Sequence, residues 1–234
     1  MNNIFVVFKK QVKDTFTNKS VLLQVILYPI VTLIMENVIR TEGMAGHLYT
    51  KLFSAMYVGM TPLISMASII AEEKEKNTLR VLMMSNVKPW QYLTGVGLYV
   101  WMIFMVGAGL MTISLNPADI PFYLLVMGLA AIVSIAIGAC VGIITKNQMS
   151  ATSQGSIIML LLSFFPMLGT FNDTIGKIAN FVYTQHVREL LDEMSFSALK
   201  LDGAIIVAVN AVLAVVLFIA AYRKKRTGIS EDRY

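Results

Sequence analysis

The sequence is short of charged residues. Asp, Glu, Lys and Arg make up 14% of its 234 residues, and hydrophobic types make up 56%. Soluble globular domains usually carry about 25% charged and about 45–50% apolar residues. The deficit of charge runs along the whole length, and the mean hydropathy is +0.69. A soluble fold could not bury this much apolar surface, so we expect lipid to be the solvent of this chain.

Chemically reactive residue types are also scarce. Cys140 is the single cysteine, so no disulfide can form within one chain, and the two histidines, His47 and His186, lie far apart in sequence. Neither histidine has a second ligand at metal spacing, so we expect both to be solvated and no metal to be bound. No nucleophile and base lie together in an apolar run. We therefore expect no catalytic residue, no bound cofactor and no enzymatic activity in the chain alone.

A phosphate-binding loop is absent. The string Gly-x-x-x-x-Gly-Lys-Ser/Thr, whose backbone cradles phosphates, does not occur, so the chain cannot hydrolyse a nucleotide by that route. The apolar runs also lack the mid-membrane carboxylate on which a proton- or sodium-driven carrier usually depends. Their exception is Glu36, which we expect to pair with Arg40 one turn later at the membrane interface. The energy for any transport must therefore come from elsewhere.

What the sequence has in quantity is apolar runs of about 20 residues, each long enough to cross a bilayer as a helix. Leu, Met and Ala dominate these runs and alternation with a period of two is absent, which favours helices over a barrel of strands. The sequence therefore predicts an all-α membrane protein, a single transmembrane domain over residues 1–234 with six spans. The spans are expected at about 21–39, 52–71, 92–114, 122–145, 150–171 and 204–222.

Lysine and arginine are distributed unevenly between the loops. If the N-terminus lies inside, 14 of the 19 Lys and Arg residues fall in inner segments. Cytoplasmic loops are enriched in these residues, so we expect both termini to be cytoplasmic, as an even number of spans requires. The charge lies in short loops between apolar runs, so the net charge of +5 reflects topology, and no nucleic-acid partner is expected.

Residues 2–18 have the pattern of an amphipathic helix lying in the inner membrane interface. Their apolar residues recur at helical spacing, and lysines cover the other side. The apolar members are Phe5, Phe8, Val12 and Phe16. The alternative is that this segment is only the polar start of the first span.

Two further segments between spans are amphipathic. The inner loop 72–91 begins with a charged stretch and continues with Leu79, Leu82 and Met83 on one helical face. The outer segment 172–202 predicts a helix that rests on the outer interface or dips into it. Its apolar face consists of Val187, Leu190, Leu191 and Met194.

Small and polar residues mark two of the expected spans. Ser134, Gly138 and Gly142 are four residues apart on one face of the fourth span and include a Gly-x-x-x-Gly match, which lets helices approach closely. The inner half of the fifth span is polar, with Ser153 and Gln154 among its residues. That half either lines a path or bonds to a neighbouring helix.

The order of these segments, and the loop after the second span above all, resembles the type-2 permeases of ABC transporters. The family pattern in this loop is roughly acidic-basic-Glu-x-Gly-Thr-Leu-Glu-x-Leu-Leu, then Ser/Thr-Pro-Val and a Gly a few residues on. The residues that fit it are Glu73, Lys74, Glu75, Thr78, Leu79, Leu82, Met83, Ser85, Val87 and Gly95. The departures are Asn77 for Gly, Arg80 for Glu and Asn86 for Pro, with the proline moved along to Pro89.

The resemblance implies that this loop is a coupling helix, which docks in a cleft of a separate ATP-binding subunit, and that helix 2–18 braces the same subunit. The residues expected to dock are Glu73, Glu75, Thr78, Leu79, Arg80, Leu82, Met83, Ser85, Asn86, Val87 and Lys88. Leu79, Leu82 and Met83 would enter the apolar cleft while charged members pair at its rim. ATP and magnesium would bind in the partner subunit, and its closure would tilt the spans beneath an outer helical cap.

The resemblance further implies an exporter in a bacterial cytoplasmic membrane, with a second permease, identical or homologous, beside the path. By family analogy its cargo is an amphipathic peptide, an antimicrobial peptide, a drug or a lipid-linked molecule. Two other classes stay open. One is a self-contained channel or secondary carrier, against which the missing mid-membrane carboxylates count. The other is a membrane immunity protein that binds a toxin peptide.

Overall fold

The computed structural model describes residues 3–15, 19–39, 46–169, 172–195 and 201–231, and no strand occurs within them. This confirms the all-α class predicted from the sequence. The helices are α1 (Asn3–Asp14), α2 (Lys19–Ile34), a π-helical turn (Met35–Ile39), α3 (Leu48–Glu75), α4 (Thr78–Met84), α5 (Pro89–Met111), a 3₁₀ turn (Thr112–Ser114), α6 (Ile120–Ile144), α7 (Gln148–Gly169), α8 (Asp173–Ala179), α9 (Tyr183–Glu193) and α10 (Leu201–Glu231).

Five helices in the described part of the chain are long and apolar enough to cross a membrane. They lie at Leu48–Glu75, Pro89–Ser114, Ile120–Ile144, Gln148–Gly169 and Leu201–Ala220. The predicted bounds of these spans fall within four residues of the helix ends, except that α10 continues to Glu231. The protein is therefore a helical membrane protein.

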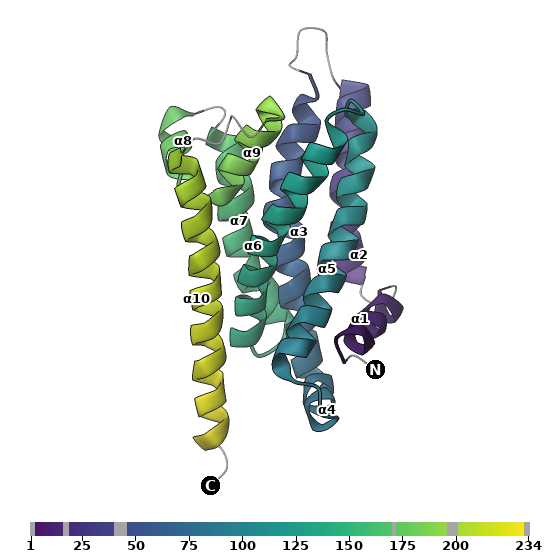
Figure 1. Cartoon of the computed structure of the whole chain (residues 1–234), viewed down its shortest axis with the longest axis vertical. Helices are drawn as coiled ribbons and strands as arrows, with labels where there is room; N and C mark the ends of the chain where they lie inside the picture. The colour runs from purple at the N-terminus through teal and green to yellow at the C-terminus, as the bar shows by residue number, and fades with distance from the viewer. Residues whose placement is uncertain (1–2, 16–18, 40–45, 170–171, 196–200, 232–234) are drawn as a thin grey trace.

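The first of the six expected spans remains a prediction. Helix α2 and the π turn together are helical from Lys19 to Ile39, as the sequence predicts. The apolar helix found there, Val25–Ile39, is shorter than the other five. It lies alongside α3 and α5 in the bundle (Figure 1).

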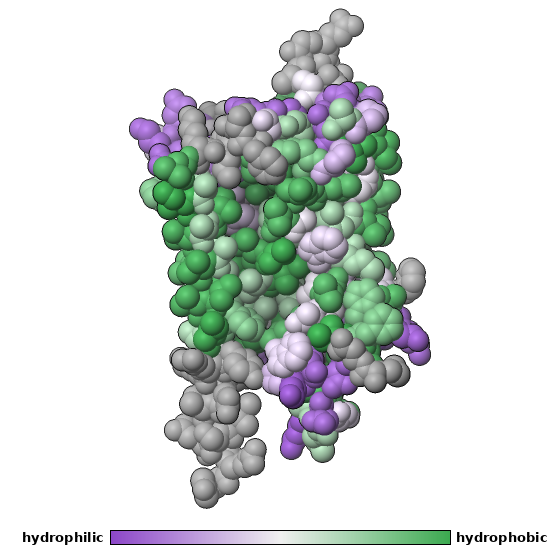
Figure 2. Space-filling model, viewed as in Figure 1, coloured by the Kyte–Doolittle hydropathy of each residue, from purple (hydrophilic) through white to green (hydrophobic). Residues whose placement is uncertain are grey.

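Helix α3 runs through the middle of the bundle, with α2, α5, α6 and α7 packed against it (Figure 1). Helices α1 and α4 and the last turns of α10 lie at one end, which we call the α4 end. Helices α8 and α9 lie at the other, the α9 end. On the face that Figure 2 shows, the surface between the two ends is a largely apolar band with a few weakly polar residues in it. This pattern is that of a bundle whose middle faces lipid and whose ends face water.

Close packing of α6 on α3 explains the spacing of small residues in α6. A Cβ added at Gly138 would lie 2.3 Å from the carbonyl oxygen of Leu63, and one at Gly142 would lie 2.8 Å from the Cβ of Ile70. Ser134, on the same face, donates a hydrogen bond to the carbonyl oxygen of Val58. The three residues therefore form a helix-packing face, as expected where lipid gives helices no hydrophobic reason to associate.

Glu36, in the π-helical turn, is buried and caps α3. Its Oε2 accepts hydrogen bonds from the backbone nitrogen of Thr50 at 3.1 Å and from the Thr50 hydroxyl at 3.4 Å. A carboxylate is stabilised at a helix N-terminus, and His47, the residue before α3, supplies no side-chain cap. We expected Glu36 to pair with Arg40 at the interface. Arg40 lies outside the described residues, so that pair stays a prediction; the contacts with Thr50 join the π-helical turn to α3.

The outer helix α9 is inserted into the bundle and does not rest on its surface. Val187, Leu190 and Leu191 are buried, and Met194, at the end of the helix, packs against the same cluster. Tyr183 contacts the hydroxyl of Ser134 on α6, and Thr184 donates a hydrogen bond to the carbonyl oxygen of Leu162 on α7. These contacts close the α9 end of the bundle.

The expectation that both histidines are solvated is wrong for His186. Its side chain is 7% exposed, and its two ring nitrogens lie 3.0 Å from a carboxylate oxygen of Glu189 and 3.0 Å from the carbonyl oxygen of Asn180. The sequence did not reveal this, because the residue is polar and borders the expected apolar face of α9 without belonging to it. In the structure both sides of the first turns of α9 are covered.

The packing face of α6 makes a direct prediction. Gly138→Ala places a methyl group against the α3 backbone, so we expect a loss of about 1–3 kcal/mol, the usual cost of overpacking a core. Gly109→Ala is the matched control, because no atom lies within 4 Å of a Cβ built there. The measurement is the thermal unfolding midpoint of each variant in detergent. Equal midpoints for the two variants would show that α6 does not pack on α3 at Gly138.

Candidate docking site at the α4 end

Helix α4 is a single short helix set between two tight turns. Asn77, which precedes it, has φ 57°, and Asn86, which follows it, has φ 63°. Left-handed backbone of this kind is open to glycine and, among other residues, best tolerated by asparagine. Asn77 can therefore stand where the family pattern has glycine. Proline could not stand at position 86, because its ring fixes φ near −65°, and the proline instead occupies the first position of α5 at Pro89.

The two faces of α4 have different surroundings. Leu79, Leu82 and Met83 are partly buried and pack against the chain's own cluster at the α4 end. On the opposite face Val81 is 59% exposed and Met84 is 79% exposed. Part of the surface of Leu79, Leu82 and Met83 therefore fixes α4 to the bundle, and their entry into a partner's cleft stays a prediction. The exposed apolar residues of α4 are Val81 and Met84.

The other expected docking residues also fall into an exposed group and a buried group. Arg80, Ser85, Asn86 and Lys88 are exposed around Val81 and Met84, and Glu75 is exposed at the end of α3; Thr78 is partly exposed at the start of α4. Val87 and Glu73 are buried. These two cannot meet a partner's side chains, so the charged rim at the outward face of α4 consists of Arg80 and Lys88.

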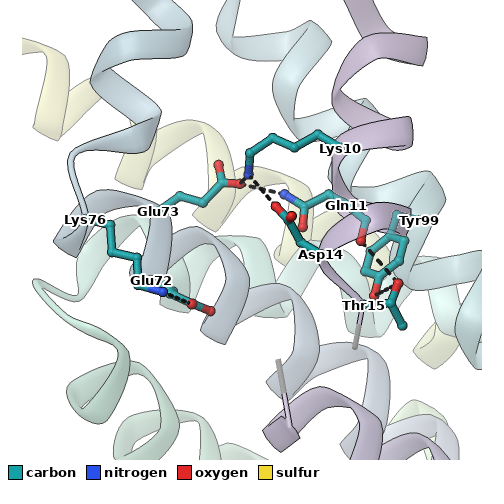
Figure 3. Close-up of polar contacts among 8 residues, drawn as sticks. All are labelled: Lys10, Gln11, Asp14, Thr15, Glu72, Glu73, Lys76 and Tyr99. Atoms are coloured by element: carbon teal, nitrogen blue, oxygen red, sulfur yellow. Dashed lines mark hydrogen bonds and ion pairs between the residues drawn. The ribbon is translucent and has the colours of Figure 1, made fainter. Parts of the chain in front are cut away.

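Glu73 joins α3 to α1 (Figure 3). Its Oε1 accepts a hydrogen bond from Gln11 at 2.6 Å and forms an ion pair with Lys10, which also lies 3.3 Å from Asp14. Burial alone would lower the pKa of Lys10. The hydrogen bond to Glu73 and the charges of Glu73 and Asp14 outweigh burial and raise that pKa above its usual value. A buried carboxylate is costly unless paired, so these contacts fix where α1 lies.

Helix α1 is held at both of its ends. The Asn3 side chain donates to the carbonyl oxygen of Asn86 at 3.2 Å and to the Gln91 side chain at 3.1 Å. At the other end the hydroxyls of Thr15 and Tyr99 lie 3.0 Å apart (Figure 3). Helix α1 thus contacts the turn after α4 as well as α3 and α5. Of its expected apolar face, Phe8 is partly buried, Phe5 and Val12 are exposed, and Phe16 lies outside the described residues.

The two residues after Glu73 join α3 to two more helices. The Lys74 ammonium donates hydrogen bonds to the carbonyl oxygens of Gly142, Ile143 and Thr145 at the end of α6. Glu75 Oε2 accepts from the backbone nitrogen of Gln148, the first residue of α7, at 2.9 Å. A cation at a helix C-terminus and a carboxylate at a helix N-terminus both favour the helix dipole. The sequence motif showed these charges, but their partners lie some 70 residues away and gave no local signal.

Of the polar residues expected in the inner half of the fifth span, Thr152 contacts a neighbouring helix, since its hydroxyl lies 3.3 Å from the Ser68 hydroxyl on α3. Ser153 and Gln154 are exposed on α7, on the same face as the exposed Ile157 and Leu161. Gly155, on the other face, packs against Ile64 of α3. Bonding to a neighbouring helix therefore applies to Thr152, and lining a path stays a prediction for Ser153 and Gln154.

The chemistry available at the α4 end is that of protein binding. In the part of the chain that the structure describes, no group of three or more His, Cys, Asp or Glu side chains gathers to hold a metal ion. The outward face of α4 instead offers two exposed apolar side chains flanked by Arg80 and Lys88. An apolar centre with a polar, charged rim is the usual composition of a protein interface.

Comparison with known proteins gives one finding. The sequence model of a protein family described as "ABC-2 family transporter protein" matches residues 8–223. The match covers α1 from residue 8 onward, all of α4, and the five long helices, of which α10 is covered as far as residue 223. No curated protein matches the sequence.

The buried Glu73 predicts how firmly α1 is held. Glu73→Ala removes the acceptor of Lys10 and Gln11, so α1 should loosen by about 1.5–3 kcal/mol, the usual worth of hydrogen bonds to charged groups. The measurement is hydrogen exchange of the backbone amides of residues 3–14. The control is Glu72→Ala, whose carboxylate pairs with Lys76 in its own helix. If both variants leave exchange in α1 unchanged, Glu73 does not hold α1.

The left-handed turn before α4 predicts a second effect. Asn77→Val puts a β-branched residue at φ 57° and should cost about 1–2 kcal/mol, seen as faster amide exchange over residues 78–84. Asn77→Gly keeps the left-handed turn without strain. Amide exchange over residues 78–84 should therefore be as fast as in the unchanged protein, or slower. Equal exchange in both variants would contradict the assigned backbone conformation.

Proposed function

This chain belongs to the ABC-2 family of transporter proteins and is therefore the permease, or membrane subunit, of an ABC transporter, and we propose that it couples ATP hydrolysis in a separate subunit to export. A permease of this family works with an ATPase that is another chain. In our proposal the ATPase docks on the outward face of α4. ATP and magnesium then bind in that partner and not in the permease.

The observation that carries the proposal is the outward face of α4. Val81 and Met84 are among the most exposed apolar residues at the α4 end, and Arg80 and Lys88 flank them. Exposed apolar side chains outside the apolar band have no lipid to cover them, so a partner protein is their natural cover. The inner face of α4 is packed on the bundle, so a force applied to the outer face acts on the whole α4 end.

The contacts at the end of α3 connect α4 to the other helices of the bundle, so a force on α4 can reach them. A push on α4 reaches α3 through a turn of two residues, Lys76 and Asn77. From α3 it passes to α1 through Glu73, to α6 through Lys74 and to α7 through Glu75. All three contacts involve a charged side chain, and two of them place that charge at the end of a helix. Charge-assisted hydrogen bonds have a more specific geometry than apolar contacts, so these contacts should hold the helices in fixed relative positions. We propose that these helices tilt together when the ATPase closes.

We propose that a second permease, a copy or a homologue, completes the path. Helix α7 is little covered within one chain, and its exposed face is mixed, with Ser153 and Gln154 toward one end and Ile157 and Leu161 toward the other. A face of this kind suits an amphipathic cargo such as a peptide or a drug, because it offers polar contacts and apolar contacts one after the other along the helix. Helix α9, inserted at the far end, would cap the path between such faces.

The proposed topology has six spans with both termini in the cytoplasm of a bacterial cell. The helical stretch Lys19–Ile39 supplies the first span, since α2 and its π turn run alongside α3 and α5. Of the 19 Lys and Arg residues, 14 lie on the side of α1, α4 and the C-terminus, which favours a cytoplasmic α4 end. Helix α1 then lies at the inner interface of the cell membrane, with Phe5 and Val12 exposed to it.

Photocrosslinking from α4 tests the proposal. A photoreactive phenylalanine analogue at position 81, in cells that express the permease at native level, should crosslink to a protein that carries a phosphate-binding loop. The same analogue at Ile178 on α8 is the control, since that side chain is 50% exposed at the opposite end. Mass spectrometry identifies the crosslinked chain. A crosslink from position 81 only to proteins without such a loop would contradict the proposal.

A variant series measures the same interface. Arg80→Glu with Met84→Asp should abolish co-purification with the crosslinked ATPase, because it reverses a rim charge and places a carboxylate in an apolar contact. Lys177→Glu with Ile178→Asp makes the same changes at the α9 end and should leave co-purification as it is. Both variants should reach the membrane in equal amounts. Retained co-purification of the Arg80 and Met84 variant would show that the ATPase docks elsewhere.

A further inference from the structure

An apolar groove lies between α1 and α5 on the surface of the bundle. It has a volume of about 400 Å³ and is open along one side. It is lined by Ile4, Phe5, Phe8, Leu98, Trp101 and Met102. The groove does not include the docking face of α4, and the proposed function makes no use of it.

The groove is a built feature of the packing between the two helices. The helices approach closely at Gly95, where an added Cβ would lie 2.8 Å from the Cβ of Val7. The next turns of α5 carry the large side chains of Leu98 and Trp101, which line the groove. The indole nitrogen of Trp101 donates to the carbonyl oxygen of Gly128 at 2.9 Å, so this wall is fixed in place. The rings of Phe5 and Phe8 stack with centroids 6.4 Å apart and form the other wall.

Two exposed lysines lie on α1 beyond Phe5, which lines the groove. Lys9 and Lys13 follow Phe5 at intervals of four residues, so all three lie on one side of α1. Both lysines are exposed, and neither forms an ion pair with a residue that the structure describes. Lys10 differs, because it is paired with Glu73 and Asp14. One and two helical turns along α1 from Phe5, two positive charges are therefore available to a ligand that extends out of the groove.

We propose that this groove binds an anionic phospholipid, with one acyl chain between α1 and α5 and the phosphate at Lys9 and Lys13. An apolar slot about as large as a single acyl chain accepts any lipid. The two lysines select among lipids, because each basic residue near the surface attracts an anionic headgroup by about 1 kcal/mol. The site requires only that the chain lies in a bilayer, so it stands apart from the docking of an ATPase.

Fluorescence quenching by brominated lipids tests the site. The chain has two tryptophans, so Trp90→Phe leaves Trp101, in the groove, as the only tryptophan, whose emission is excited selectively. The protein is placed in nanodiscs of phosphatidylcholine with a rising fraction of phosphatidylglycerol brominated on its acyl chains. We expect half-maximal quenching at a several-fold lower fraction of brominated phosphatidylglycerol than of equally brominated phosphatidylcholine. Lys9→Gln with Lys13→Gln should remove that difference.

The control is Lys146→Gln with Lys177→Gln, which removes the same charge from exposed positions outside the groove. It should keep the preference for phosphatidylglycerol. Equal quenching by the two brominated lipids would mean that Trp101 meets bulk lipid only, and would overturn the proposal. A preference that survives in the Lys9 and Lys13 variant, or that is lost equally in the control, would also overturn it, because the headgroup would then not be held at those lysines.

Discussion

Three consecutive charged residues at the end of α3 hold the α4 end of the bundle together. Glu73 pairs with Lys10 of α1, Lys74 donates to the last carbonyls of α6, and Glu75 accepts from the first amide of α7. Charges near the membrane are costly unless they are paired, so each contact fixes the position of the element it meets. The same constraint acts at the opposite end of α3, where Glu36 caps the helix.

These contacts determine which part of the chain is free to bind. Because α4 uses Leu79, Leu82 and Met83 to pack on the bundle, its exposed face is left with Val81, Met84 and the flanking charges. Because α4 is anchored to the bundle on one side and exposed on the other, a force that a partner applies to its exposed side would act on the bundle. Membership of the ABC-2 family makes the chain a transporter's membrane subunit, and in our proposal motion at α4 reaches α1, α6 and α7 through the contacts at the end of α3.

Periodicity in the sequence predicted the helices well but not which way the short ones face. The runs of apolar residues placed five spans to within four residues, apart from the end of α10, because length and composition alone decide such helices. An amphipathic pattern in α4 or α9 fits packing on the chain itself as well as on a partner or a membrane. The burial of Glu73 was hidden because its partner Lys10 lies 63 residues away. The sequence showed Asn77 only as a departure from the glycine of the family pattern and gave no direct sign of its left-handed backbone conformation.

The central claim is that α4 and the helices tied to α3 move as one body. The distance between spin labels at Ser85, after α4, and Lys146, between α6 and α7, tests it most directly in the assembled transporter with and without ATP. Cys140, the only native cysteine, is replaced first. We predict that ATP leaves the distribution of this distance unchanged while distances to the second permease shift. A change between Ser85 and Lys146 of the same size as those shifts would contradict the account.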